Sequence, residues 1–397
     1  MLKSITGHFR ALLERMYAYG GFSPFFIAQE GNMKIAVIDA DLIGRKKHRF
    51  PNLTCLKLSG YYKEEGNDVV LKMDYDRLED YDKVFIAKVF TDTEVPNDVL
   101  SLPNVTYGGT GFFYDKAIPL PYNIEHHFPD YHLYDEWVEK QIASGKKPKE
   151  FVYYKDYSIG FLTRGCFRHC PFCVNKNYNR VQAHSPLSEF LDTSRKKIAF
   201  LDDNFFGYRD WETLLDEVRA SGKRFQFRQG LDERLLDDKR CEKLFSSKYD
   251  GDFIFAFDNI KDARLIEEKL ALIRKYTNKQ MKFYVICGFD YSGQWGESFW
   301  RQDLFDLMER IRILMKWRCY PYIMRFARYK ESPYSGFYIT VARWCNQPNF
   351  YKKVSLLEFA RMNGENSAAY KAVAKVLKDE PGIEKYLSMA YERMSAK

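Results

Sequence analysis

The stretch GFLTRGCFRHCPFCVNK, residues 160–176, places Cys166, Cys170 and Cys173 within eight positions. It overlaps the end of the strand-like run YSIGFLT at residues 157–163. The chain has only 8 cysteines in 397 residues, so a chance gathering of three in one loop is a weak explanation. Grouped thiolates bind zinc and iron–sulfur clusters, and the sequence therefore predicts a metal centre in this loop.

Six strand-like runs start here and alternate with amphipathic helical segments, in which apolar residues recur at three- and four-residue spacing. The runs are residues 157–163, 197–202, 224–229, 252–258, 282–288 and 321–326. Successive β/α units of this kind predict a curved parallel sheet that forms a partial or a closed barrel. Such barrels carry their chemistry on the loops that follow the strands, and the cysteine loop follows the first strand.

A shorter series of the same kind starts after Met33. Its strand-like runs are residues 34–39, 68–72, 83–88 and 104–109. The alternation predicts a small Rossmann-like domain with a parallel sheet. The turn DADLIG follows its first strand and GGTGFF follows its last, and ligands of open parallel sheets bind at such turns. A turn that needs the flexibility of glycine explains GGTG equally well.

We therefore predict an α/β chain in five segments. These are an N-terminal extension at 1–32, the Rossmann-like domain at 33–115, a surface linker at 116–156, a partial (β/α)6 barrel at 157–330 and a mainly helical region at 331–397. The residues QEGN before Met33 back-translate to a purine-rich sequence that resembles a bacterial ribosome-binding site. We expect Met33 to be the native start, which the intact mass of the natively expressed protein would test.

The composition is that of a folded globular protein, with 46% hydrophobic and 29% charged residues. The net charge of +8 is too small to identify a nucleic-acid-binding protein, and the basic clusters at 45–49 and 146–149 are interpreted as solvated loops. The sequence has no apolar run of about eighteen residues, so we expect no membrane contact. The scattered cysteines lie in mostly apolar surroundings, which is typical of reduced thiols and predicts a cytoplasmic protein. They are Cys55, Cys241, Cys287, Cys319 and Cys345.

The number of cysteines distinguishes between two kinds of metal centre. Three thiolates can bind three irons of a four-iron cluster and leave the fourth iron open to a substrate or cofactor. Structural zinc takes four protein ligands, and His169 or His184 would have to supply the fourth without the paired spacing of common zinc modules. The sequence favours the iron–sulfur cluster. The histidines of the linker are interpreted as surface groups, although they could bind a metal; they are His126, His127 and His132.

The spacing Cys-x3-Cys-x2-Cys, with Phe172 directly before the last cysteine, resembles the radical S-adenosylmethionine (SAM) superfamily over residues 155–330. This resemblance implies that the three cysteines bind a [4Fe–4S] cluster and that the open iron chelates the amino and carboxylate groups of SAM. It further implies reductive cleavage of SAM to a 5′-deoxyadenosyl radical that abstracts hydrogen from a substrate.

The same resemblance implies contacts with SAM for residues that follow the strands. Asp202, Asp203 and Asn204 would bind the methionyl ammonium. The other candidates are Arg228 and Gln229 for the carboxylate, Asp258 for the ribose, Gly288 for a close backbone approach to adenine, and the aromatic Phe172. Each of the Asp and Asn residues has an ordinary alternative role as a helix cap.

Residues 33–115 resemble, more loosely, the cobalamin-binding domain of one radical SAM subgroup. The Asp-x-His-x-x-Gly signature of that domain falls at Asp39, Asp41 and Gly44, so Asp41 replaces the histidine that would ligate cobalt. The glycine pair of the domain is present as Gly108 and Gly109. The resemblance implies a cobalamin site; the alternative is a domain that kept the fold and docks a substrate or partner.

The predicted function is that of a radical SAM enzyme acting on an unidentified small molecule, peptide or RNA. It would need an external electron donor of the flavodoxin or ferredoxin type, and its reaction could be methyl transfer through cobalamin or another radical reaction. The alternative is a non-catalytic iron–sulfur or zinc protein that binds RNA through basic and aromatic surface. Cys319 and Cys345 are interpreted as buried thiols, with covalent catalysis as their alternative role.

Overall fold

The computed structural model describes residues 32–391, which form two compact units. Unit 1 runs to Gly160 and also includes Ser185–Lys196, and unit 2 comprises Phe161–His184 and the chain from Lys197 onward. The predicted extension, apart from Asn32, lies outside the described residues.

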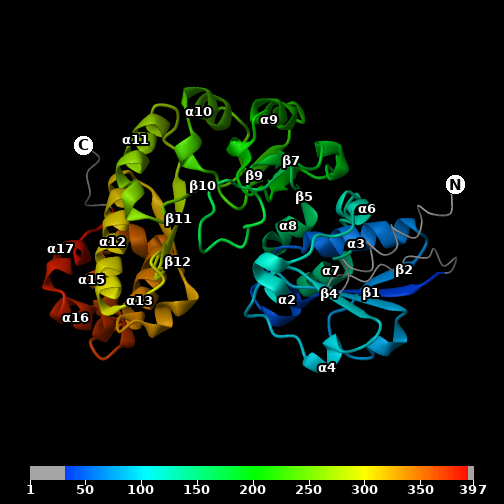
Figure 1. Ribbon diagram of the computed structural model, residues 1–397, viewed down its shortest axis with the longest axis horizontal. Helices are drawn as coiled ribbons and strands as arrows, with labels where there is room; N and C mark the ends of the chain where they lie inside the picture. Colours follow the sequence, from blue (N-terminus) through cyan, green and yellow to red (C-terminus); the bar gives the residue numbers. More distant parts are fainter. Residues whose placement is uncertain (1–31, 392–397) are drawn as a thin grey trace, which may run out of the picture. The chain divides into compact units, whose positions relative to one another are not determined.

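Unit 1 is built on a parallel sheet of four strands in the order β2-β1-β3-β4 (Figure 1). The strands are β1 (Lys34–Asp39), β2 (Asp68–Leu71), β3 (Lys83–Ala87) and β4 (Val105–Gly108). Residues 35–39 of β1 are all buried, as expected for a strand that is covered on both faces of a parallel sheet. The parallel α/β class predicted for this part of the chain is confirmed.

The helices of unit 1 are mostly short. The side chain of Asn52 caps α3 by accepting hydrogen bonds from the backbone N–H groups of Thr54 and Cys55. The α-helices are α2 (Ala40–Gly44), α3 (Leu53–Glu64), α4 (Asn97–Leu100), α5 (Thr110–Phe113), α6 (Tyr122–Glu125), α7 (Asp135–Ala143) and α8 (Val152–Lys155). The 3-10 helices are η1 (Leu78–Asp80), η2 (Tyr114–Lys116), η3 (Pro148–Phe151) and η4 (Leu187–Glu189), and β5 (Tyr157–Gly160) follows α8.

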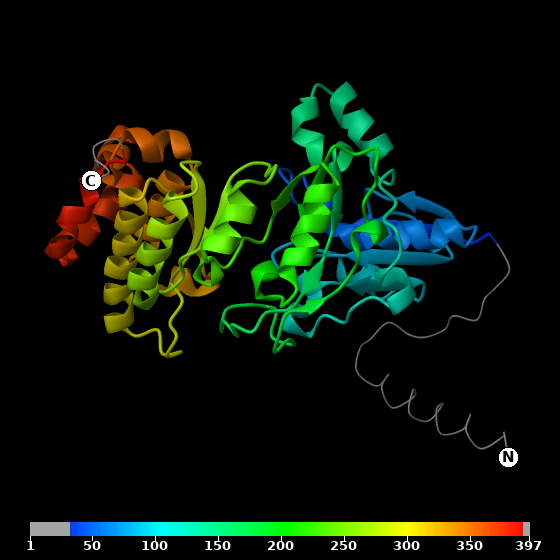
Figure 2. The same ribbon diagram turned by 90° about the horizontal axis from the view of Figure 1, so that it is seen from above.

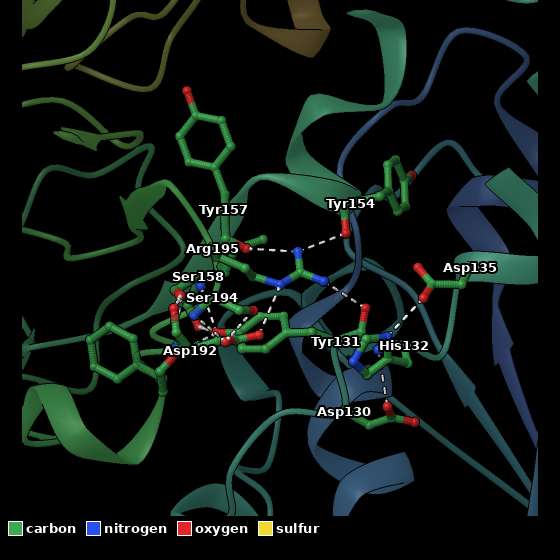
Figure 3. Close-up of polar contacts among 12 residues, drawn as sticks. Asp130, Tyr131, His132, Asp135, Tyr154, Tyr157, Ser158, Asp192, Ser194 and Arg195 are labelled. Carbon is green, nitrogen blue, oxygen red and sulfur yellow. Dashed lines mark hydrogen bonds and ion pairs between the residues drawn. The ribbon is translucent and has the colours of Figure 1, made fainter. Parts of the chain in front are cut away.

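The segment predicted as a linker, residues 116–156, contains α6, α7 and α8 and contributes buried side chains to unit 1. Arg195 ties this segment to the short stretch that returns to unit 1 (Figure 3). Its buried guanidinium group donates to the carbonyl oxygens of Tyr154 at 2.7 Å, Tyr157 at 3.2 Å and Tyr131 at 2.9 Å. One arginine therefore provides hydrogen bonds to three carbonyl groups of buried residues.

Unit 2 contains five longer strands and one short pair. The pair is β6 (Thr163–Arg164) and β7 (Gln182–Ala183), which is antiparallel. The longer strands are β8 (Lys197–Phe200), β9 (Arg224–Phe227), β10 (Phe253–Ala256), β11 (Met281–Cys287) and β12 (Tyr320–Arg325). β8 pairs with β9, β10 with β11 and β11 with β12, always in parallel, so the α/β class predicted here is confirmed as well.

Helices alternate with these strands as the spacing of apolar residues predicts. Each buries one stripe, as α9 does with Trp211, Leu215 and Val218. The helices between strands are α9 (Trp211–Ala220), α10 (Asp238–Phe245), α11 (Ala263–Arg274) and α12 (Glu297–Lys316), with η5 (Phe205–Gly207), η6 (Glu233–Leu235) and η7 (Ile260–Asp262). Helix α12 lies along β11 and β12 (Figures 1 and 2).

The C-terminal region is helical, as predicted. It comprises η8 (Ala327–Glu331), α13 (Ser335–Cys345), α14 (Pro348–Lys353), α15 (Leu356–Met362), α16 (Ala368–Asp379), η9 (Pro381–Ile383) and α17 (Glu384–Leu387). Helix α13 packs against β12 and α16. Within residues 32–391, no helix is both long enough and apolar enough to cross a membrane.

Candidate metal and cofactor site

The three cysteines lie in a loop whose two ends are held together. β6 and β7 pair antiparallel and so bring residues 164 and 182 side by side at the base of the loop. Gly165 begins the loop with a φ of +96°, and a Cβ at this position would lie 2.4 Å from the carbonyl oxygen of Arg180. Only glycine allows this conformation and this close approach, so the loop depends on Gly165.

Asp202 and Asp203, directly after β8, bind the start of the same loop. Oδ1 of Asp202 accepts from the backbone N–H and the hydroxyl of Thr163, both at 2.7 Å, and Oδ2 accepts from the N–H of Leu162 at 3.2 Å. Asp203 accepts from the N–H of Gly165 at 2.7 Å. Burial raises the pKa of Asp202 to about 7, against the opposing effect of these hydrogen bonds. Both aspartates thus position the cysteine loop.

The sulfur atoms receive hydrogen bonds of the kind that stabilise thiolates. Cys166 Sγ accepts from the backbone N–H of Arg168 at 3.4 Å and from the side-chain Nδ2 of Asn204 at 3.4 Å. Cys173 Sγ accepts from the backbone N–H of Asn175 at 3.3 Å. In iron–sulfur proteins such N–H···S contacts help to set the reduction potential.

Burial raises the pKa of the Cys170 and Cys173 thiols. For Cys170 the pKa rises to about 11, because burial is reinforced by the charges of Asp258 and Cys173. The pKa of Cys173 is raised by burial, with further contributions from Asp203 and Cys166. The thiols must lose their protons to bind iron, so assembly of a cluster here releases protons and depends on pH.

Among the residues that the structure describes, no three His, Cys, Asp or Glu side chains are grouped so as to hold one metal ion. In a four-iron cluster each cysteine binds a different iron. The donor set of three thiolates, with N–H groups directed at two of the sulfurs, fits such a cluster.

Asn204 and Asp232 connect the cysteine loop with the loops after β8 and β9. Nδ2 of Asn204 reaches Asp232 Oδ2 at 3.3 Å as well as Cys166, while its buried Oδ1 has no hydrogen-bond partner. Asp232 also accepts from Nε of Arg168 at 2.6 Å and Nε of Arg234 at 2.7 Å. Burial alone would raise the pKa of Asp232, but the hydrogen bonds from the two arginines hold it below its ordinary value.

A second buried carboxyl group lies beside this network. Glu233 accepts from the N–H of Ala256, at the end of β10, at 3.2 Å with one oxygen, while its other oxygen has no partner. Burial and then the charge of Asp232 raise the pKa of Glu233 to about 8. The group is therefore a neutral acid near neutral pH.

The residues predicted after β9 and β10 are also at the carboxyl ends of their strands. Arg228 is half-buried and Gln229 is exposed. Asp258 accepts from the N–H of Ile286 at 2.9 Å, and burial raises its pKa. The buried guanidinium of Arg310 on α12 donates to the carbonyl oxygens of Asp258 at 2.9 Å and Ile286 at 2.8 Å, and so links the ends of β10 and β11.

Gly288 follows β11 with a φ of +72°. Its N–H donates to Asp303 at 2.8 Å, and Asp303 also accepts from the hydroxyl of Tyr338 on α13 at 2.7 Å. The carbonyl oxygen of Gly288 accepts from the indole N–H of Trp295 at 3.3 Å. The backbone of Gly288 is thus held from α12, α13 and the loop after β11.

Phe172, the aromatic residue before the last cysteine, joins an aromatic cluster next to the loop. Its ring meets Phe289 edge-on at 5.3 Å between centroids. Phe289 in turn contacts Phe326 at 4.8 Å, Tyr291 at 5.2 Å and Trp295 at 6.2 Å. This cluster gives the site a partly exposed aromatic side, which suits a heteroaromatic ring.

No family model matches the chain. The chain is similar to solved radical SAM enzymes. One is the radical S-adenosylmethionine methyltransferase TsrM from Kitasatospora setae with cobalamin and a [4Fe-4S] cluster bound; its TM-score is 0.46 at 11% identity, over 74% of this chain and 72% of that chain. Another is the cobalamin-dependent S-adenosylmethionine radical enzyme OxsB with aqua-cobalamin and S-adenosylmethionine bound, with a TM-score of 0.36 at 12% identity, over 89% of this chain and 56% of that chain. These likenesses concern only the course of the chain.

In unit 1 the residues predicted for cobalamin contact the chain itself. Oδ2 of Asp41 accepts from the N–H of Val89 at 2.6 Å, and Oδ1 accepts from the hydroxyl of Thr93 at 2.5 Å. Gly109 has a φ of +109°, and a Cβ there would lie 2.3 Å from the carbonyl oxygen of Lys88. Gly108, at the end of β4, accepts from the N–H of Lys88 at 3.1 Å. These contacts join the turns after β1, β3 and β4 at the carboxyl edge of the sheet.

The three histidines of the predicted linker and the last two cysteines of the chain have structural surroundings. His126 pairs with Glu189 at 2.8 Å, His132 with Asp135 at 2.8 Å, and His127 with Glu64. His127 and His132 also line a hollow of about 370 Å³ in unit 1, which contains none of the predicted site residues. Cys319 and Cys345 are buried, which confirms their interpretation as buried thiols.

The charged residues that connect the loops were not predicted from the sequence. Arg168 lies within the cysteine loop, and Asp232, Glu233 and Arg234 belong to the stretch LDER after β9. Their position after a parallel strand is the same signal that identified Asp202 and Asp258. That signal could have found them, but it could not have shown that they pair with a loop about sixty residues away.

Proposed function

We propose that the chain is a radical SAM enzyme, with a [4Fe–4S] cluster on Cys166, Cys170 and Cys173. The observation that carries the proposal is the cysteine loop itself, closed by β6 and β7 and hydrogen-bonded to residues that follow the parallel strands β8 and β9. Asp203, Asp232 and Asp258 follow β8, β9 and β10, and each bonds to this loop or acts on the charge of its thiols. Three cysteines leave one iron without a protein ligand.

When bound, the cluster and SAM would supply a 5′-deoxyadenosyl radical for hydrogen abstraction, through one-electron reductive cleavage of the sulfonium C–S bond with methionine as the other product. The residues of this chain bind and orient the reactants. We assign the methionyl ammonium to Oδ1 of Asn204, the carboxylate to Arg228, and the adenine to the aromatic side formed by Phe172 and Phe289.

The external donor is proposed to be an acidic carrier of the flavodoxin or ferredoxin type. Residues 161–184 contain Arg164, Arg168, Lys176 and Arg180 and no Asp or Glu. Arg168 pairs with Asp232, and the other three basic side chains give the loop a positive charge that would attract an acidic partner and speed its encounter. The substrate stays open among small molecules, peptides and RNA.

Methyl transfer through cobalamin is one reaction open to such an enzyme, with cobalamin at the carboxyl edge of the unit 1 sheet. Asp41 stands where the cobalamin-binding signature has its histidine, so cobalamin would bind there without that ligand. An optical spectrum of the purified protein after incubation with hydroxocobalamin and gel filtration tests this point, because bound cobalamin absorbs in the visible range.

The alternative function is a non-catalytic metal protein that binds RNA. The same cationic loop, with Phe167 exposed to 36%, favours contact with a polyanion. Metal analysis distinguishes the two functions, since the radical enzyme needs about four irons with acid-labile sulfide, whereas a zinc protein holds one zinc.

The proposal is tested by anaerobic reconstitution with iron and sulfide, followed by SAM and dithionite. The wild type should form 5′-deoxyadenosine, and Cys173→Ala should form none, because the cluster loses a ligand. Cys241→Ala removes a buried cysteine of α10 and should retain both cluster and product. Product formation by Cys173→Ala at the wild-type rate would contradict the proposal.

A further inference from the structure

Asn204 has one amide atom fully engaged and the other without a partner. The residue follows β8 and is 3% exposed. Its Nδ2 donates to Cys166 Sγ at 3.4 Å and to Asp232 Oδ2 at 3.3 Å. Its Oδ1 is buried and accepts no hydrogen bond. An unpaired buried acceptor costs about 1–3 kcal/mol, so a ligand that donates to Oδ1 would recover this free energy on binding.

Asp232 fixes which way the amide points. Its carboxylate accepts from Arg168 and Arg234, at 2.6 Å and 2.7 Å. An ionised carboxylate and a thiolate can only accept hydrogen bonds, so both require the nitrogen of Asn204 and exclude its oxygen. The orientation of the amide is therefore set by its neighbours, and Oδ1 is left as a free acceptor on the other side.

We propose that Asn204 couples the binding of SAM to the reduction potential of the cluster. This inference rests on the proposed function. Oδ1 accepts from the ammonium group of SAM while Nδ2 donates to the sulfur of Cys166. When the carbonyl oxygen of an amide accepts from a cation, the amide polarises and its N–H becomes a stronger donor. A stronger N–H···S bond withdraws negative charge from the thiolate and raises the potential of the cluster.

The consequence is that SAM binding controls when the cluster is reduced. Without SAM the cluster holds the lower potential and is reduced less readily. With SAM in place the potential rises, so that reduction occurs mainly when the sulfonium that consumes the electron is present. In this arrangement Asn204 binds the ligand, and Asp232 is a positioning residue that acts through Asn204.

The test compares the midpoint potential of the reconstituted cluster with and without SAM. The electron paramagnetic resonance signal of the reduced cluster follows the titration. The wild type should show a positive shift when SAM binds. Each protein is compared with itself, so a fixed change of charge or packing cancels from the difference.

Two variants separate the roles of the amide. Asn204→Asp keeps an acceptor for the ammonium but loses the N–H donor, so it should retain SAM binding and show a smaller shift than the wild type. Asn204→Ala loses both and should bind SAM about 10-fold more weakly or worse, with a smaller shift than the wild type at saturating SAM. Asn179→Asp, an exposed residue of the same loop, makes the same change of charge and should keep the wild-type affinity and shift.

The outcomes distinguish this inference from the proposed function. A wild-type cluster that cleaves SAM but shows no shift overturns the coupling and leaves the enzyme assignment intact. So does a full shift in either cluster-loaded variant of Asn204. Failure of the wild type to assemble a four-iron cluster overturns the proposed function itself.

Discussion

At the scale of single residues, buried carboxyl groups shape both units. Asp39 ends β1, and its Oδ1 accepts from the N–H of Leu42 while its Oδ2 accepts from the hydroxyl of Tyr134 at 2.9 Å. Burial nevertheless raises its pKa from 3.8 to about 7. Its carboxylate is therefore less stable in the folded chain than in water, whatever its hydrogen bonds contribute.

The raised pKa of Asp39 predicts a pH-dependent stability. The folded state binds a proton more tightly than the unfolded state, so the contribution of Asp39 is fully present below about pH 3.8 and is lost as pH rises to about 7. Asn at this position does not titrate. Wild type should thus lose stability relative to Asp39→Asn between pH 5 and pH 7.5, by no more than a few kcal/mol.

Urea denaturation of both proteins at the two pH values measures this difference. Because Asp202 and Glu233 also titrate, only the difference between wild type and variant reports on Asp39. A difference in midpoint that stays constant across this pH range would show that Asp39 is ionised throughout.

At the scale of elements, the loop between β6 and β7 depends on its backbone more than on its side chains. Gly165→Ala should reduce iron loading strongly, since the new Cβ would lie 2.4 Å from the carbonyl of Arg180 and force the loop open. Gly222→Ala is the matched control, because Gly222 also has a positive φ, +70°, but a Cβ there meets no atom within 4 Å.

Iron and sulfide analysis after identical reconstitution measures the effect. Both variants carry the cost of a left-handed alanine, about 1–2 kcal/mol. Only Gly165→Ala should lose the cluster as well. Equal iron contents in the two variants would show that the loop adapts to the additional carbon.

The elements themselves were accessible from the sequence, since their cores are periodic. A short stretch of sequence is enough to predict a strand with an apolar run such as KIAFLD. The same holds for a helix with an apolar stripe such as Ile266, Leu270 and Ile273. The cysteine loop was accessible for the same reason. What was not accessible is the pairing of Arg168 with Asp232, because a contact between distant residues leaves no local pattern. Nor does the sequence show that Asp202 binds Thr163 and is thereby occupied.

At the scale of the whole molecule, the net charge of +8 hides an uneven distribution. Residues 161–184 contribute four positive charges without a single acid, and this stretch carries the cysteines. Charged side chains around a redox centre affect the rate of association with a partner more than they affect the stability of the fold. The local charge of residues 161–184 is therefore more informative about the proposed electron donor than the net charge of the whole chain.

The last prediction concerns this donor. Arg180 is exposed at the edge of the cysteine loop, so Arg180→Glu should slow reduction of the cluster by an acidic flavodoxin several-fold at low salt. Lys378→Glu makes the same change of charge on α16, and its cluster should be reduced at the wild-type rate.

Stopped-flow absorbance measures the second-order rate constant of this reduction. The difference between Arg180→Glu and wild type should disappear in high salt, because screening shortens the range of the charges. Equal slowing by the two substitutions would mean that total charge steers the donor, and a difference that persisted in high salt would mean that Arg180 acts through the structure of the loop.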